Sequence, residues 1–156
     1  MFTRTAFKSL ALAATIALSF VGAAQAKDDI SPADSKAMHD YVLSMDKIKA
    51  MGAAMDEFKA HPGMQAQAKA VGDSSKSIAE MEAKVQGNPQ LMAVYSHHGL
   101  NAADAVVMPF VLMYAGMCVQ YPTMAAGLAQ QTSPAQIAFY KAHQADLKTI
   151  KWLSGG

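Results

Sequence analysis

The sequence predicts an all-α fold: a single compact helical bundle of five or six helices around an apolar central helix at about residues 102–120. Three observations lead to this prediction. Alanine, methionine, lysine and glutamine, all good helix formers, are frequent along the chain. Serine–proline and asparagine–proline pairs recur where helices would begin. The 156 residues are 52% hydrophobic and 16% charged with a net charge of +1, which fits one folded domain and excludes a disordered chain.

The first 26 residues predict a cleaved secretory signal peptide rather than part of the fold. Arg4 and Lys8 precede an apolar stretch, Leu10 to Ala24, and Ala24-Gln25-Ala26 forms a cleavage site of small residues. The apolar stretch has about 15 residues, fewer than the ~20 that span a bilayer. We therefore expect residues 27–156 to form one helical domain of a bacterial protein that is periplasmic or secreted, without a transmembrane segment.

The first helix is expected to begin at Ser31-Pro32-Ala33-Asp34. Serine caps free backbone N–H groups, proline suits the first turn, and the helix dipole favours the aspartate. Apolar residues then recur at steps of three, four and seven, which predicts one amphipathic helix of about 28 residues that ends before His61-Pro62-Gly63. Its predicted apolar face consists of Met38, Tyr41, Met45, Ile48 and Met55, widened by Val42, Met51 and Phe58.

Three shorter helices are expected next. An alanine-rich piece from Met64 to Val71 should stop at Gly72. Ser77 and Glu80 have the spacing of a capping box within a second amphipathic helix near 74–86. Asn88-Pro89 then starts a further helix that should end at Gly99.

The most apolar element is predicted from Ala102 to about Gln120, with Asn101 as its cap. Apart from Pro109, which should kink or break this helix, its central part has no side chain more polar than Tyr114 or Cys118. A helix that is apolar on all sides must be buried, so we expect the other helices to enclose it.

The last helix is expected to open with a capping box at Ser133-Pro134-Ala135-Gln136. Its predicted inner face contains Ile137, Tyr140, Leu147 and Ile150, and Trp152 and Leu153 close the chain before Gly155 and Gly156.

Two stretches resemble a group of small exported bacterial helical proteins without an assigned activity. One runs from Asn88-Pro89 through Leu91 and Gly99-Leu100 into the apolar helix. The other is Tyr41-Val42-Leu43 followed by Met45 and Lys49. The resemblance implies a helical fold and export, and it implies no chemistry.

Twelve methionines are the most unusual feature of the composition. Met51 and Met55 lie one helical turn apart, as do Met113 and Met117. Thioether sulfur suits Cu(I), so these four residues with His97 or His98 are the candidate ligands of a periplasmic Cu(I) carrier. Methionine also fills gaps in helical cores, and packing is the interpretation that the periodicity favours.

The histidines offer weaker alternatives. Adjacent His97 and His98 are expected to point to different sides of a helix and not to share one ion. The sequence has no H-E-x-x-H, C-x-x-C or C-x-x-C-H motif for zinc or covalent haem. We therefore predict no cofactor. The alternative that stays open is noncovalent haem held by a methionine and by His39 or His143.

No catalytic motif stands out. Cys118, the single cysteine, lies in the most apolar stretch, which favours a buried inert thiol and excludes a disulfide within the chain. There is no G-x-S-x-G motif and no glycine-rich phosphate loop, so we predict that the protein is not an enzyme. Arg4 is the only arginine, which makes nucleic acid a poor candidate partner.

The leading hypothesis is therefore a noncatalytic exported helical binding or interaction protein. Its partner would be an envelope protein, a peptide or an apolar small molecule between helices. The alternative is the Cu(I) or haem carrier described above.

Overall fold

The computed structural model describes residues 30–154, and these form nine α-helices and one 3-10 turn, with no strand among them. The all-α prediction is confirmed, but the helices outnumber the five or six expected. The predicted leader, residues 1–26, and the two final glycines lie outside the described residues. The helices are α2 (Pro32–Asp40), α3 (Met45–Ala60), α4 (Pro62–Ser74), α5 (Ile78–Gln86), α6 (Pro89–His97), α7 (Ala102–Gln120), α8 (Pro134–Ala142), α9 (Gln144–Thr149) and α10 (Lys151–Ser154), with the turn η1 (Pro122–Met124) after α7.

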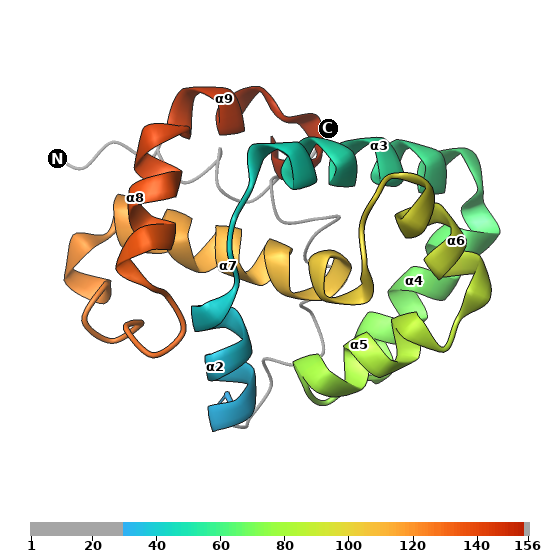
Figure 1. Ribbon diagram of the computed structural model, residues 1–156, viewed down its shortest axis with the longest axis horizontal. Coiled ribbons are helices and arrows are strands. Elements are labelled where there is room, and N and C mark those ends of the chain that lie inside the picture. The colour runs from blue at the N-terminus through green and yellow to red at the C-terminus, as the bar shows by residue number, and fades with distance from the viewer. Residues whose placement is uncertain (1–29, 155–156) are drawn as a thin grey trace, which may run out of the picture.

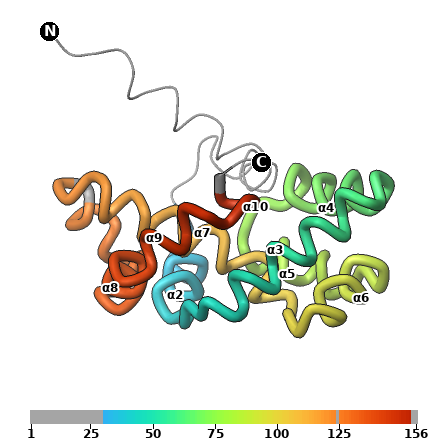
Figure 2. Tube along the Cα trace, turned by 90° about the horizontal axis from the view of Figure 1, so that it is seen from above, coloured from blue at the N-terminus to red at the C-terminus, as the bar shows by residue number. Residues whose placement is uncertain are grey.

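Helix α7 runs through the middle of the molecule and contributes more buried apolar residues to the core than any other helix (Figures 1 and 2). Helices α2, α5 and α8 pack directly against it. Thirteen of its 19 residues are buried, and Met108 and Val111 are completely inaccessible. Asn101 caps the helix as predicted, and the helix continues through Pro109. Of the two effects expected of this proline, the break is wrong and the kink stays a prediction. Packing from several sides stabilises this helix despite the backbone hydrogen bond that proline cannot donate.

Helix α7 is also long and apolar enough, by length and composition, to cross a membrane. Its 19 residues reach a mean hydropathy of 1.8 over the most apolar window. However, 72% of that window is buried inside the chain's own fold. Such burial is what a core helix requires, because an all-apolar helix needs an apolar environment.

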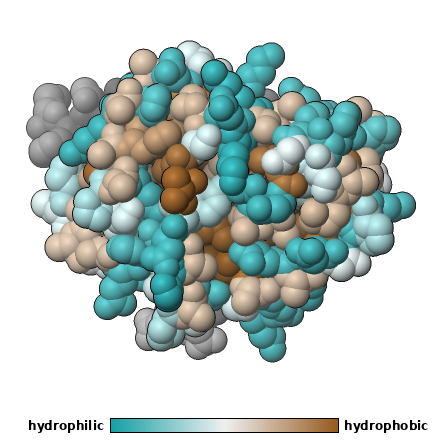
Figure 3. Space-filling model, in the orientation of Figure 1, coloured by the Kyte–Doolittle hydropathy of each residue, from teal (hydrophilic) through white to brown (hydrophobic). Residues whose placement is uncertain are grey.

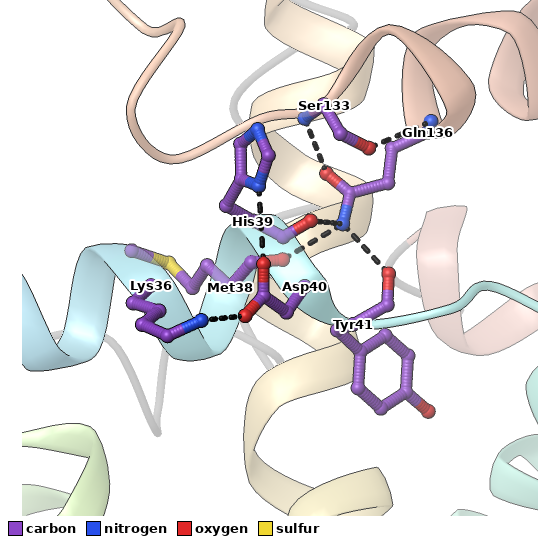
Figure 4. Close-up of polar contacts among 7 residues, drawn as sticks. All are labelled: Lys36, Met38, His39, Asp40, Tyr41, Ser133 and Gln136. Atoms are coloured by element: carbon purple, nitrogen blue, oxygen red, sulfur yellow. Dashed lines mark hydrogen bonds and ion pairs between the residues drawn. The ribbon is translucent and has the colours of Figure 1, made fainter.

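The predicted 28-residue first helix is wrong, because the chain is extended between Asp40 and Met45 and separates α2 from α3. Figure 4 shows the contact that accompanies this break. The side-chain amide of Gln136, from α8, donates to the backbone carbonyls of Met38 (2.7 Å), His39 (3.2 Å) and Tyr41 (2.7 Å). In a continuous helix these carbonyls would bond N–H groups four residues further on, so Gln136 stabilises the helix end instead.

Most predicted helix starts are confirmed. Ser31 Oγ accepts a hydrogen bond from Asp34 N at 3.0 Å, and Ser133 and Gln136 form a complete capping box. The predicted box at Ser77 is only half formed. Ser77 Oγ accepts from Glu80 N, whereas the Glu80 carboxylate accepts from Lys76 N.

Two predicted helix boundaries need correction. The alanine-rich piece does not stop at Gly72, since α4 begins at Pro62 and ends at Ser74. The amphipathic helix expected near 74–86 begins only at Ile78. Gly72, Asp73 and Ser74 can all adopt helical geometry, so the helix continues past the glycine.

The last predicted helix is divided into α8, α9 and α10 at His143 and Ile150. The divided segment brings α10 back beside α3 (Figure 1). There the Trp152 indole is buried, and its Nε1–H donates to the Ile48 carbonyl at 3.0 Å. Gly52 allows this approach, because a Cβ at that position would lie 3.1 Å from the indole ring.

Candidate functional site

Three potential metal ligands meet between the end of α3 and the end of α6. Glu57 Oε2 lies 2.8 Å from His98 Nε2 and 3.2 Å from His97 Nδ1. One ligand atom from each residue lies within 4.8 Å of the other two. The side chains of Glu57 and His98 are 31% and 21% exposed, and that of His97 is 72% exposed. We refer to these residues as the Glu57–His97–His98 cluster.

Packing next to the cluster fixes the two segments that carry it. Phe58, which follows Glu57, stacks edge-to-face on Tyr95 of α6 with ring centroids 5.2 Å apart, and both rings are buried. Such aromatic pairs add about 0.5–1.5 kcal/mol to the energy of burial. This contact therefore holds α3 and α6 together one residue from Glu57 and two or three residues from His97 and His98.

A Schellman motif ends α6 directly behind the histidines. Leu100 N donates to the Tyr95 carbonyl at 2.9 Å, and Gly99 N donates to the Ser96 carbonyl at 3.0 Å. Gly99 has φ +73°, the left-handed conformation that glycine adopts without strain. The predicted stop at Gly99 is confirmed, and the motif fixes the backbone of His98 at the helix end.

The expectation that His97 and His98 point to different sides of a helix is wrong. Their ring centroids are 4.8 Å apart, and both rings approach the same carboxylate oxygen. Side chains at consecutive helical positions leave the helix in directions about 100° apart. Both imidazole rings can still reach one carboxylate that lies between these two directions. The sequence could not reveal Glu57 as the third member, because it lies 40 residues from His97 on another helix.

The electrostatics of the cluster favour an anionic carboxylate facing cationic or metal-binding groups. Hydrogen bonds from His98 and then His97 hold the pKa of the Glu57 carboxyl below its ordinary value. The C-terminus of α6 carries the negative end of the helix dipole, which attracts positive charge.

The predicted methionine ligands lie in or against the core. Met51 is fully buried, and Met55, Met113 and Met117 are partly buried and pack against the core cluster. Methionine fills such positions well through its flexible side chain. The hypothesis that these four residues bind Cu(I) together with His97 or His98 stays a prediction.

The remaining candidates have local partners. His39 Nδ1 lies 3.3 Å from Asp40 Oδ1, and the His143 ring lies 4.6 Å from that of Phe139. The prediction that either binds haem is untested. Cys118 is a free cysteine, and it is buried as predicted.

A second feature is an open groove between α4, α5 and α6, with a volume of about 670 Å³. Side-chain amides form a hydrogen-bonded row along it. Asn88 Nδ2 donates to Gln67 Oε1 at 3.0 Å, and Gln67 Nε2 donates to Gln90 Oε1 at 2.8 Å. Lys84 lies on its α5 wall, and Val71 is among its apolar lining residues. We call this feature the amide-lined groove.

The face seen in Figure 3 mixes hydrophilic with weakly hydrophobic side chains, and its strongly hydrophobic patches are small and separated from one another. Among the described residues the large apolar side chains that are exposed are Ile30, Val42 and Tyr121.

Comparison with protein-family models, curated proteins and solved structures gives no match to this chain. The resemblance to exported bacterial helical proteins therefore stays a prediction.

Proposed function

We propose that this chain is a noncatalytic, exported binding protein whose amide-lined groove takes an uncharged, extended peptide segment. The observation that carries the proposal is the row of side-chain amides from Gln67, Asn88 and Gln90 along an open groove. An amide group has two N–H donors and one oxygen acceptor, as peptide backbone groups have donors and acceptors, and here only part of this capacity is used within the row and in the Asn88 cap of α6. The volume of about 670 Å³ falls within the range of ligand sites.

The groove is also suited to side chains of such a peptide. Its walls combine the amides with small or apolar residues, including Ala70, Val71 and Pro89. The lining contains one cationic group, Lys84, which is already bonded to Glu80 and to Ser74. A ligand without strong charge therefore matches the groove better than an anionic one.

Mass spectrometry of the protein, purified gently from its own host, tests the proposal. We expect a reproducible copurifying peptide. The variant Ala70→Trp, which fills the groove, should lose this peptide, and the matched variant Ala53→Trp on the exposed side of α3 should keep it. Purification without any bound peptide would contradict the ligand class. Turnover of a small substrate, abolished by one side-chain change, would contradict the noncatalytic proposal.

Export rests on the Arg4 and Lys8 start, the short apolar stretch and Ala24-Gln25-Ala26. We expect cleavage after Ala26 and a protein in the periplasm or outside the cell. Intact-mass measurement of the protein from the periplasm tests this expectation, and a mass that corresponds to all 156 residues would contradict it.

The rival function is a Cu(I) or haem carrier. The meeting of His97 with His98 favours the Cu(I) carrier, whose candidate ligands include these two residues. Titration with Cu(I) against a competing chelator, and with haemin followed by its Soret band, measures both activities. Binding no tighter than about micromolar, a weak affinity for a carrier, would remove this rival.

A further inference from the structure

We propose that the Glu57–His97–His98 cluster is a binding site for a divalent first-row transition-metal ion of the Zn²⁺ and Cu²⁺ class. The inference stands apart from the peptide groove, because none of the three residues lines that groove. It also differs from the Cu(I) hypothesis, because it uses a carboxylate and no thioether.

The donor set determines the class of ion. Two imidazole nitrogens and one carboxylate oxygen are ligands of intermediate hardness, which suit Zn²⁺ and Cu²⁺. Ions such as Mg²⁺ and Ca²⁺ prefer oxygen ligands throughout, and Cu(I) prefers sulfur. By the general order of stability for divalent ions, Cu²⁺ should bind more tightly than Zn²⁺.

The distances are close to those that a tetrahedral ion requires. Metal bonds of about 2.0–2.1 Å place two tetrahedral ligands roughly 3.3 Å apart. The carboxylate oxygen of Glu57 already lies 2.8 Å from His98 Nε2 and 3.2 Å from His97 Nδ1. The three atoms lie within 4.8 Å of one another, so small side-chain rotations would bring them around one ion.

The surroundings support the same function. The stacked rings of Phe58 and Tyr95 hold α3 against α6, and the Schellman motif at Gly99 fixes the segment that carries both histidines. Ligands held in place before binding lose less conformational entropy when the ion arrives. The negative end of the α6 dipole adds an attraction for a cation.

The exposure of the cluster defines how the site would work. His97 is 72% exposed, so one side of the bound ion would face solvent and keep a fourth position open for water. A closed structural site would have four protein ligands. The open arrangement fits reversible uptake and release of the ion.

The experiment uses the tag-free full-length protein, because an affinity tag of histidines would bind the same ions. Zn²⁺ and Cu²⁺ are titrated separately in the presence of a chromophoric competing chelator. We expect one tight site per chain, and a loss of affinity of about tenfold or more in each of Glu57→Gln, His97→Ala and His98→Ala. A large excess of Mg²⁺ or Ca²⁺ should leave the affinity unchanged.

Two matched variants separate this site from nonspecific binding to histidine. His61→Ala and His39→Ala remove surface histidines outside the cluster and should keep the wild-type affinity. The proposal is overturned if the double variant His97→Ala/His98→Ala binds like wild type, or if His61→Ala weakens binding to the same extent as His98→Ala. Circular dichroism of each apo variant checks folding, and the exposed His97 gives a variant whose fold should not change. Ala70→Trp should lose any groove ligand without a change in metal affinity, so the two proposals can fail separately.

Discussion

At the scale of single residues, the carboxylate of Asp104 connects three parts of the fold. It is 2% exposed, and its Oδ1 accepts hydrogen bonds from Tyr41 Oη and Lys47 Nζ, both at 2.7 Å. Its Oδ2 accepts from Asn101 N at 3.1 Å. Burial acts to raise the pKa of Asp104, but the hydrogen bonds from Lys47, Tyr41 and Asn101 outweigh it and leave the pKa lowered. One side chain thus joins α3, α7 and the extended segment before α3.

The variant Asp104→Asn should destabilise the protein by about 1.5–3 kcal/mol at pH 7, because a neutral amide weakens the charge-assisted hydrogen bonds from Lys47 and Tyr41, while Lys47, 41% exposed, stays partly hydrated. A carboxyl with a lowered folded-state pKa contributes stability above its unfolded pKa of about 3.9 and loses it as the pH falls through the folded value. The difference between wild type and variant should therefore be full at pH 7 and shrink progressively below about pH 4. Urea unfolding across this range measures it.

The control is Asp73→Asn, whose carboxylate is exposed and pairs with Lys69 on the same helix. Exposed pairs contribute about 0–1 kcal/mol, so this variant should unfold nearly like wild type. An Asp104→Asn penalty that stays constant from pH 7 to about pH 3 would show that the charge of Asp104 is not what stabilises the fold.

Gln136 shows what sequence can and cannot reveal about a residue. Its spacing from Ser133 predicts a capping box, and the structure contains it, because capping depends on residues three apart. Its second set of contacts, to carbonyls at the end of α2, lies nearly a hundred residues away in the chain. A local pattern contains no information about such a partner.

At the scale of elements, the difference between local contacts and contacts distant in the chain explains which helix boundaries could be predicted. The starts of α2, α7 and α8 follow from Ser31, Asn101 and Ser133, each of which caps its own helix. The breaks after Asp40 and at His143 have no proline or glycine to announce them. Apolar periodicity continues across the first break, because an extended segment can also bury alternate residues, as Leu43 does while Val42 is 79% exposed.

The contact between α7 and α8 depends on a missing side chain at Gly116. A Cβ there would lie 3.1 Å from the Tyr140 ring and hydroxyl. Alanine is favoured over glycine in helices by about 1 kcal/mol, so we expect Gly116→Ala to stabilise a Tyr140→Ala background by roughly that amount. In wild type the steric contact should reduce or reverse the gain. A double-mutant cycle measured by urea unfolding gives this coupling.

Gly63→Ala provides the comparison, since nothing lies within 4 Å of an added Cβ at that position in α4. Its effect should be the same with and without Tyr140. Equal effects of Gly116→Ala in both backgrounds would mean that the ring moves aside without cost and that the glycine does not determine the contact.

At the scale of the whole molecule, the predicted central helix is where sequence and structure agree most closely. Its bounds, its cap and its burial follow from composition, because an all-apolar helix has to be enclosed. The candidate metal cluster followed only in part. His97 and His98 were identifiable by residue type, whereas Glu57 and the convergence of the rings depend on how α3 packs against α6.

The burial of α7 leads to a strong prediction at Val111, which is completely inaccessible. Val111→Asp should cost more than about 4 kcal/mol, because it places an unpaired charge in the core. Val42→Asp makes the same chemical change at a residue that is 79% exposed, and it should alter stability by no more than about 0.5 kcal/mol. Thermal unfolding followed by circular dichroism compares the two variants. Similar melting of Val111→Asp and wild type would mean that α7 is not the core.

The C-terminal segment completes the fold through one aromatic residue. Trp152 is buried against α3, and its indole N–H is bonded to the Ile48 carbonyl, so it joins the last helix to the first half of the chain. Trp152→Ala should cost about 3–5 kcal/mol through the lost packing. Trp152→Phe keeps most of the apolar surface but not the hydrogen bond, and should cost about 1 kcal/mol for the bond itself. Urea unfolding measures both effects. If Trp152→Ala unfolds like wild type, the contact of Trp152 with α3 does not stabilise the fold.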